Sequence, residues 1–187
     1  MEISGQLEDL EEVFGAELIE TARVSATNRT LTKLRTAANR EVRRAYNLRA
    51  RDVRKAMRIV RAGRGQSAGF LIVEGPRVPL NAFGARQTRR GVTVRVRKGS
   101  GRRLVRGAFK ARMPSGHEGV FVRRRQGGQR ARRLPIDERY SLSVAQMLRA
   151  EGVLGTVLEQ ADAEYRRQLA DQLRYRVEKR LGRFDRR

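Results

Sequence analysis

GVTVRVR at residues 91–97 is the stretch that decides the fold class. It alternates apolar and polar side chains, so a strand built from it has one apolar face and one polar face. That period of two predicts a sheet that buries only one of its faces. The apolar set comprises Val92, Val94 and Val96, and the polar set comprises Thr93, Arg95 and Arg97.

Other strand-like segments surround this stretch, and helical segments lie before and after them. GFLIVE at 69–74 is a short apolar run between glycines, and two further strands are expected at 104–112 and 118–124, joined through Pro114-Ser115-Gly116. Gly-, Arg- and Gln-rich loops are expected at 63–69, 99–103 and 125–133. Helices before and after a group of strands predict an α+β fold, with a small antiparallel-rich sheet flanked by helices.

Apolar residues at three- and four-residue steps predict the helices. They are expected at 6–22, 28–47, 50–57, 143–149 and 152–181. The last would be about 45 Å long, which exceeds the diameter of a small domain, so we expect it to pack along a neighbour or to project as an arm. Its predicted stripe consists of Leu154, Leu158, Ala161, Tyr165, Leu169, Leu173 and Val177.

The charge pattern divides the chain into three segments. Residues 1–20 hold seven acids and no Lys or Arg, residues 21–133 hold 32 basic residues and four acids, and residues 134–187 hold 11 basic residues and nine acids. We therefore expect an acidic N-terminal helical arm at 1–25, a basic α+β core domain at 26–149 and a long C-terminal helix at 150–187. The basic segment requires counterions, an acidic surface or nucleic acid. The acidic segment is one candidate, in the same chain or a neighbouring copy, and a solvated acidic helix is the alternative.

Composition excludes several classes of protein and site. The 187 residues contain no Cys, which removes disulfides, thiolate metal sites and cysteine nucleophiles. No run of about 18 apolar residues occurs, and the acidic start lacks the features of a secretory signal, so we expect neither a membrane span nor export and place folding in the cytoplasm.

The sequence contains no recognisable catalytic or cofactor motif. The single histidine, His117, precedes Glu118, and a turn role with a hydrogen bond is favoured over half of an acid–base pair. The Gly-rich segments at 61–69 and 98–103 lack the Gly-Lys-Ser/Thr ending of a phosphate-binding loop. We therefore expect no enzyme, no metal and no cofactor.

Arginine dominates the basic residues, with 38 Arg among the 43 Lys and Arg. Arginine binds phosphates and carboxylates in a bidentate manner, so the bias fits DNA contact or charged subunit interfaces, and a GC-rich genome is a third explanation. Loop and strand-end clusters are the candidates for sequence-independent contact with DNA or with acidic surfaces of neighbouring subunits. They are Arg102, Arg103, Arg123, Arg124, Arg125, Arg130, Arg132 and Arg133.

Four blocks in the middle of the chain occur in a characteristic order. They are LRTAANREVRRAYNLRARDVRKAMRI at 34–59, VPLNAFGARQTRRGVTVRVRKGSGRR at 78–103, GAFKARMPSGHEGVFVRR at 107–124 and RLPIDERYSLSVAQML at 133–148. Together they resemble the prophage minor tail protein Z family, the tail completion proteins of long-tailed phages. The resemblance covers roughly residues 26–149.

This resemblance implies a structural virion protein at the head-proximal end of a phage tail, the neck. The implied form is a homo-oligomeric ring, expected to be a hexamer, that helps to join tail to head and lets DNA pass. Implied partners are further copies of the chain, a tail terminator or tail tube protein, the head–tail connector and DNA in the lumen. From the charge alone, the alternative is a sequence-independent nucleic-acid-binding protein of ribosomal or nucleoid type.

The blocks also contain the candidate residues of a subunit interface. Aromatic and Met side chains are enriched at interfaces, whereas Gly84, Gly116 and Pro135 suit turns and the entry to the last block. A fold-keeping role inside one subunit is the alternative for each residue. The interface candidates are Phe83, Arg86, His117, Pro135, Tyr140 and Met147.

Overall fold

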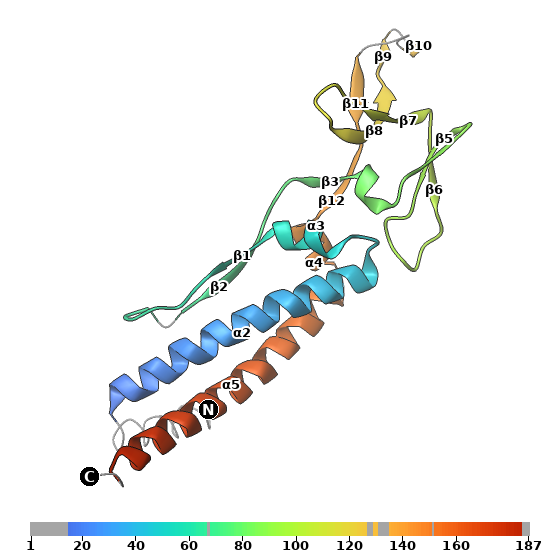
Figure 1. Ribbon diagram of the computed structural model, residues 1–187. Coiled ribbons are helices and arrows are strands. Elements are labelled where there is room, and N and C mark those ends of the chain that lie inside the picture. The colour runs from blue at the N-terminus through green and yellow to red at the C-terminus, as the bar shows by residue number, and fades with distance from the viewer. Residues whose placement is uncertain (1–14, 67, 127–128, 131–134, 151, 185–187) are drawn as a thin grey trace. The chain divides into compact units, whose positions relative to one another are not determined.

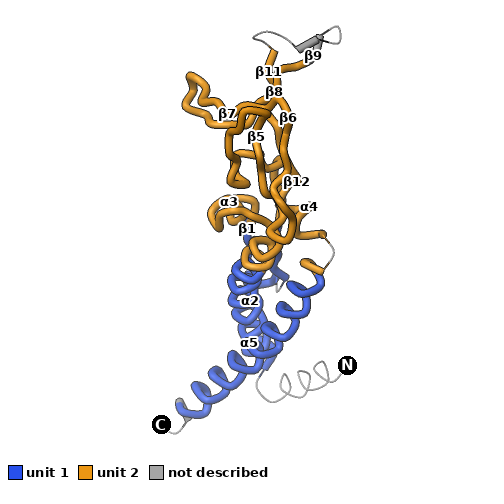
Figure 2. The backbone as a smooth tube through the Cα atoms, turned by 90° about the vertical axis from the view of Figure 1, so that its right-hand side faces the viewer, with its two compact units in different colours: residues 1–37, 58–72, 155–187 blue, residues 38–57, 73–154 orange. Residues whose placement is uncertain are grey.

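A computed structural model describes residues 15–66, 68–126, 129–130, 135–150 and 152–184 (Figure 1). The chain forms two compact units, coloured in Figure 2, and each is described by itself. We call residues 1–37, 58–72 and 155–187 the helical unit, and residues 38–57 and 73–154 the strand unit.

Two long helices build the helical unit, α2 (Ala16–Ala45) and α5 (Val153–Phe184). Their side-by-side packing in Figure 1 is antiparallel, and two polar contacts fix its register. Lys33 Nζ donates to Glu164 Oε1 at 2.5 Å, and Arg176 donates to Ser25 Oγ at 2.7 Å. The apolar contact between the helices consists of Ile19, Ala22, Ala26 and Leu169, with Leu18, Tyr165 and Leu173 packed against it.

Polar groups also lie between these helices. Gln168 and Gln172 are buried, and they bind the side chains of Glu164 and Arg176 respectively. The hydrogen bond from Lys33 lowers the pKa of Glu164, and burial lowers the pKa of Arg176. In the described part of the chain, no helix combines the length and the apolar composition needed to cross a membrane.

A hairpin of β1 (Met57–Val60) and β2 (Phe70–Val73) completes the helical unit. Asn28 on α2 both donates to Ala62 O and accepts from Ala62 N, each at 3.0 Å, which locks the hairpin to the helix. Glu17 accepts from Arg64, and Glu20 accepts from the backbone N–H of Gly65. Two acids of the acidic segment therefore contact the basic segment of the same chain, and the other five lie outside the described residues.

Short antiparallel strands build the strand unit. One sheet has the order β4-β5-β6, a second β11-β8-β7, and two pairs are β12-β3 and β10-β9. Its core includes Phe83, Val92, Val120 and Met147, all fully buried. The strands are β3 (Arg77–Pro79), β4 (Arg86–Thr88), β5 (Gly91–Val94), β6 (Arg103–Arg106), β7 (Ala108–Arg112), β8 (Glu118–Arg123), β9 (Arg125–Gln126), β10 (Gln129–Arg130), β11 (Ile136–Glu138) and β12 (Tyr140–Ser143).

The strand unit also contains three short helical segments: α3 (Ala50–Lys55) after α2, η1 (Leu80–Phe83) between β3 and β4, and α4 (Val144–Leu148) after β12. α4 begins with a capping box, in which Ser143 Oγ accepts from Gln146 N and Gln146 Oε1 accepts from Ser143 N. The two bonds satisfy N–H groups that a helix start leaves without partners. Val144 and Met147 then point into the core, so the cap determines which residues of the block are buried.

The predicted α+β class, with small antiparallel sheets and long helices near both ends, is confirmed. Two predictions of element boundaries were wrong. The helix break between 22 and 28 is absent, because Ser25 and Asn28 make tertiary hydrogen bonds instead of capping a helix. The single strand at 104–112 is two strands, since Gly107 has a φ of 68° and turns the chain. The division at 25/26 and 149/150 stays a prediction about domains.

The predicted stripe of α5 is correct in its second half and wrong at its start. Leu158 is 57% exposed, whereas Val157 beside it is 3% exposed. Steps of four residues drift around a helix of 3.6 residues per turn, so a stripe built from them cannot stay on one buried face. Gln168 and Gln172, which the apolar pattern could not include, lie on that face instead.

We predict that Gly91→Ala destabilises the strand unit by about 3 kcal/mol, because the position has a φ of 147° and an added Cβ would lie 2.2 Å from Val105 O. Gly99→Ala is the matched control, since nothing lies within 4 Å of its Cβ position. Thermal and denaturant unfolding of the two variants would measure the difference. Equal stability of both would contradict the close approach of β5 and β6.

Candidate interaction surfaces

The FGARQT segment at 83–88 joins several loops of the strand unit. Gly84 adopts the left-handed conformation at the end of η1. Its carbonyl accepts from Arg102 at 2.5 Å, and the same guanidinium donates to Thr93 O at 2.8 Å. Asn47 donates to Phe83 O at 3.3 Å. This turn therefore holds the loop before β6 and the segment after α2 in place.

Gln87 connects the two three-stranded sheets. Its Oε1 accepts from the backbone N–H of Lys110 at 2.8 Å, which joins β4 to β7. Its Nε2 donates to the carbonyls of Thr88 and Gly91, at 3.0 and 3.2 Å, within the β4–β5 turn. A single amide thus uses its donor and acceptor to fix both a hairpin turn and the contact between sheets.

Glu138 is the centre of a second polar cluster, on β11. Its Oε1 lies 2.9 Å from His117 Nε2, and its Oε2 accepts from the Tyr140 hydroxyl at 2.5 Å. The bond to Glu138 raises the pKa of Tyr140. Gly119 makes room for this cluster, because an added Cβ would lie 2.6 Å from Glu138 Oε1. His117 therefore pairs with Glu138, across the sheet, and not with the adjacent Glu118.

Most described members of the predicted DNA-contacting arginines have partners inside the subunit. Arg102 binds two carbonyls, and Arg123 lies over the Phe109 ring at 5.1 Å. Arg124 binds both carboxylate oxygens of Asp137, which raises the pKa of Arg124 and lowers that of Asp137. Arg103 is exposed on β6. Only the backbone of Arg125 and Arg130 is described, in β9 and β10, and Arg132 and Arg133 lie outside the described residues.

The predicted interface residues separate into buried and exposed positions. Phe83 and Met147 are fully buried within the strand unit, so they can support an interface only by shaping the surface above them. Tyr140 is 49% exposed, and His117 and Arg86 are exposed as well. Pro135 is half-buried, and its carbonyl accepts from Arg124 N. A role of these residues between subunits stays a prediction.

The outward face of the β4-β5-β6 sheet is a surface of which the arginine clusters predicted from the sequence included only Arg102. Register pairs Arg86 with Thr93 and Leu104, and pairs Thr88 with Gly91 and Arg106. Residues paired across a sheet project to the same side, opposite the buried Val92. Arg86, Arg89, Arg90, Arg102 and Arg106 lie on this face or at its turn, and we call them the arginine face.

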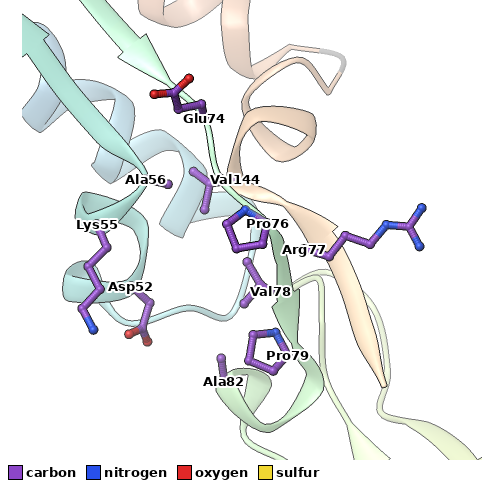
Figure 3. A pocket seen from close by; sticks show the side chains of 11 residues that line it. Asp52, Lys55, Ala56, Glu74, Pro76, Arg77, Val78, Pro79, Ala82 and Val144 are labelled. Carbon is purple, nitrogen blue, oxygen red and sulfur yellow. The ribbon is translucent and has the colours of Figure 1, made fainter. Parts of the chain in front are cut away.

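An apolar groove of about 270 Å³ lies elsewhere in the strand unit (Figure 3). Its wall is formed by Pro76, Val78 and Pro79, with Ala56 and Asp52 of the α3 region opposite and the Arg77 side chain pointing away. Such a lining suits apolar side chains more than a charged small molecule. Among the described residues, no group of three or more His, Asp or Glu is arranged to hold a metal ion.

Comparison with known proteins gives a match over almost the entire chain. The family model for prophage minor tail protein Z (GPZ) matches residues 4–187. The match extends beyond the blocks at 26–149 into both terminal segments. No curated protein and no solved structure gives a significant match.

We predict that Tyr140 loses its proton above pH 10 in a spectrophotometric tyrosine titration. Its absorbance step is the one that Tyr140→Phe removes from the titration curve. The bond to Glu138 stabilises the protonated phenol, so its contribution to stability is present below the ordinary pKa and is lost as pH rises through the raised one. Glu138→Gln should move the step toward its ordinary position. If the absorbance step that Tyr140→Phe removes lies at pH 10, the Tyr140–Glu138 bond does not form in solution.

Proposed function

Because this chain belongs to the prophage minor tail protein Z family, and is therefore a structural protein of a phage tail, we propose that it completes the tail at the end that faces the head. The match over residues 4–187 is the observation that carries this proposal. The role is structural and needs no catalysis. The location is the neck of the virion, after assembly in the host cytoplasm.

We propose further that copies of the chain form a closed ring, a hexamer that matches the symmetry of the tail. Support comes from the helical unit, which leaves Leu158, Tyr175 and Leu181 of α5 more than half exposed. They lie on different sides of the helix and form no single patch, so each is a separate candidate position for contact with another copy. A heterologous contact that repeats around an axis closes into a ring. The ring would contact the tail terminator or tube protein on one side and the head–tail connector on the other, with DNA passing through its lumen.

The family match covers the sequence of both the helical unit and the strand unit. We therefore favour the tail protein over a ribosomal or nucleoid-type function. The positive charge that motivated that alternative fits a ring through which DNA passes. With a net charge of +23 per copy, such a ring would attract the phosphates of DNA in its lumen.

If the chain forms the proposed ring, native mass spectrometry should detect an assembly of six times the subunit mass. The purified chain is measured alone and with tail tube or terminator protein. Leu158→Glu should lower the fraction of the oligomer at least tenfold, because it places a charge where an apolar contact is proposed. Ala163→Glu adds the same charge at another exposed position of α5 and should leave the mass unchanged. A monomer that persists with tube and terminator present would sink the ring proposal.

A further inference from the structure

Residues 75–117 contain twelve Lys and Arg and no Asp or Glu. The segment includes β3, η1, β4, β5, β6 and β7. Among the described residues, the only ion pair of these Lys and Arg side chains is the long one between Arg112 and Glu118, at 4.0 Å. Within the part of the chain that the structure describes, the arginine face therefore has no carboxylate partner.

The sheet holds these charges on a nearly flat support. Arg86 on β4 and Arg106 on β6 share the outward face, and the outer strands lie about 10 Å apart. Between them β5 presents Gly91 and Thr93, which are small. Arg89 and Arg90 follow at the turn, and Arg102 lies across Thr93 through its hydrogen bond to the threonine hydroxyl. Several guanidinium groups can thus reach one extended partner.

Further copies of this chain cannot balance the net positive charge. The acids of residues 1–14 number five, and every copy that brings them also brings a net charge of +23. An assembly of copies becomes more positive as it grows, so only a different and strongly acidic molecule can balance its charge. Duplex DNA carries about one negative charge per 1.7 Å of its axis, so several phosphates can lie within reach of the arginine face.

We propose that the arginine face binds the phosphate backbone of double-stranded DNA without reading its sequence. Arginine forks bind phosphate oxygens in a bidentate manner, and contacts to phosphate carry no sequence information. The contact suits DNA that must move past the protein, since every position along the duplex is equivalent. This inference rests on the proposed function, and it names the surface of the subunit that faces the lumen.

The test is the binding of the full-length chain to a 20-base-pair duplex, measured by fluorescence anisotropy between about 50 and 300 mM salt. The variant carries Arg86→Gln, Arg89→Gln, Arg90→Gln and Arg106→Gln, and Arg102 is retained because it holds the Gly84 turn. We expect the slope of log K against log salt to become shallower by about 3 to 4, since each lost phosphate contact removes about 0.9.

The control variant removes the same charge from exposed positions elsewhere in the strand unit, with Arg43→Gln, Arg49→Gln, Arg54→Gln and Arg149→Gln. Its slope should change by less than about 1. Equal losses in both variants, or a wild-type chain that does not bind near 150 mM salt, would overturn the proposal. So would tighter binding of polyglutamate than of DNA at the same salt, which would identify an acidic protein as the partner. Circular dichroism of both variants checks that they fold.

Native mass spectrometry of the wild-type chain and of the two variants distinguishes a failure of this inference from a failure of the proposed function. A ring that forms but does not bind DNA contradicts the inference alone. A monomer that binds DNA through the arginine face contradicts the ring and leaves the DNA contact in place.

Discussion

The scarcity of carboxylates is the constraint on which the rest of this structure depends. Residues 21–133 hold 32 basic residues and only four acids, so most arginines there must find other partners or remain in solvent. Arg102 binds the carbonyls of Gly84 and Thr93, and Arg97 and Arg123 lie over aromatic rings. Such contacts order loops, but they do not cancel charge. The same arginine side chains therefore stabilise the loops of the strand unit and give it a positive net charge.

Several of the few acids have more than one partner. Glu138 binds both His117 and Tyr140. Glu164 accepts from Lys33 and Gln168 and lies 3.4 Å from Arg167, and Glu41 lies between two arginines of α2. Exposed ion pairs of this kind contribute little stability individually, commonly below about 1 kcal/mol. Their value here is geometric, because they fix the register of α2 and α5 and the position of β11.

The family blocks and the charged surface have different tasks. Phe83, Gly84 and Gln87 hold the turn, the loop and the two sheets together, and Ser143 starts α4 so that Met147 is buried. These residues form the support. Arg86, Arg89, Arg90 and Arg106 lie on or beside the outward face of that support, where their charge is available to another molecule. A structural protein of this kind would act through such faces.

The sequence alone determined the fold class, the long helices near both ends, the basic middle and the family. It did so because alternation at 91–97, helical periodicity, charge counts and motif order are all local or additive properties. It could not determine that Ser25 and Asn28 continue a helix or that His117 pairs with Glu138. Nor could it determine that Arg102 is engaged while Arg86 and Arg106 pair with no carboxylate of the described residues. These depend on residues far apart in the chain, and on the strand register that places a side chain on one face or the other. Only the tertiary structure decides which of many similar arginines have partners.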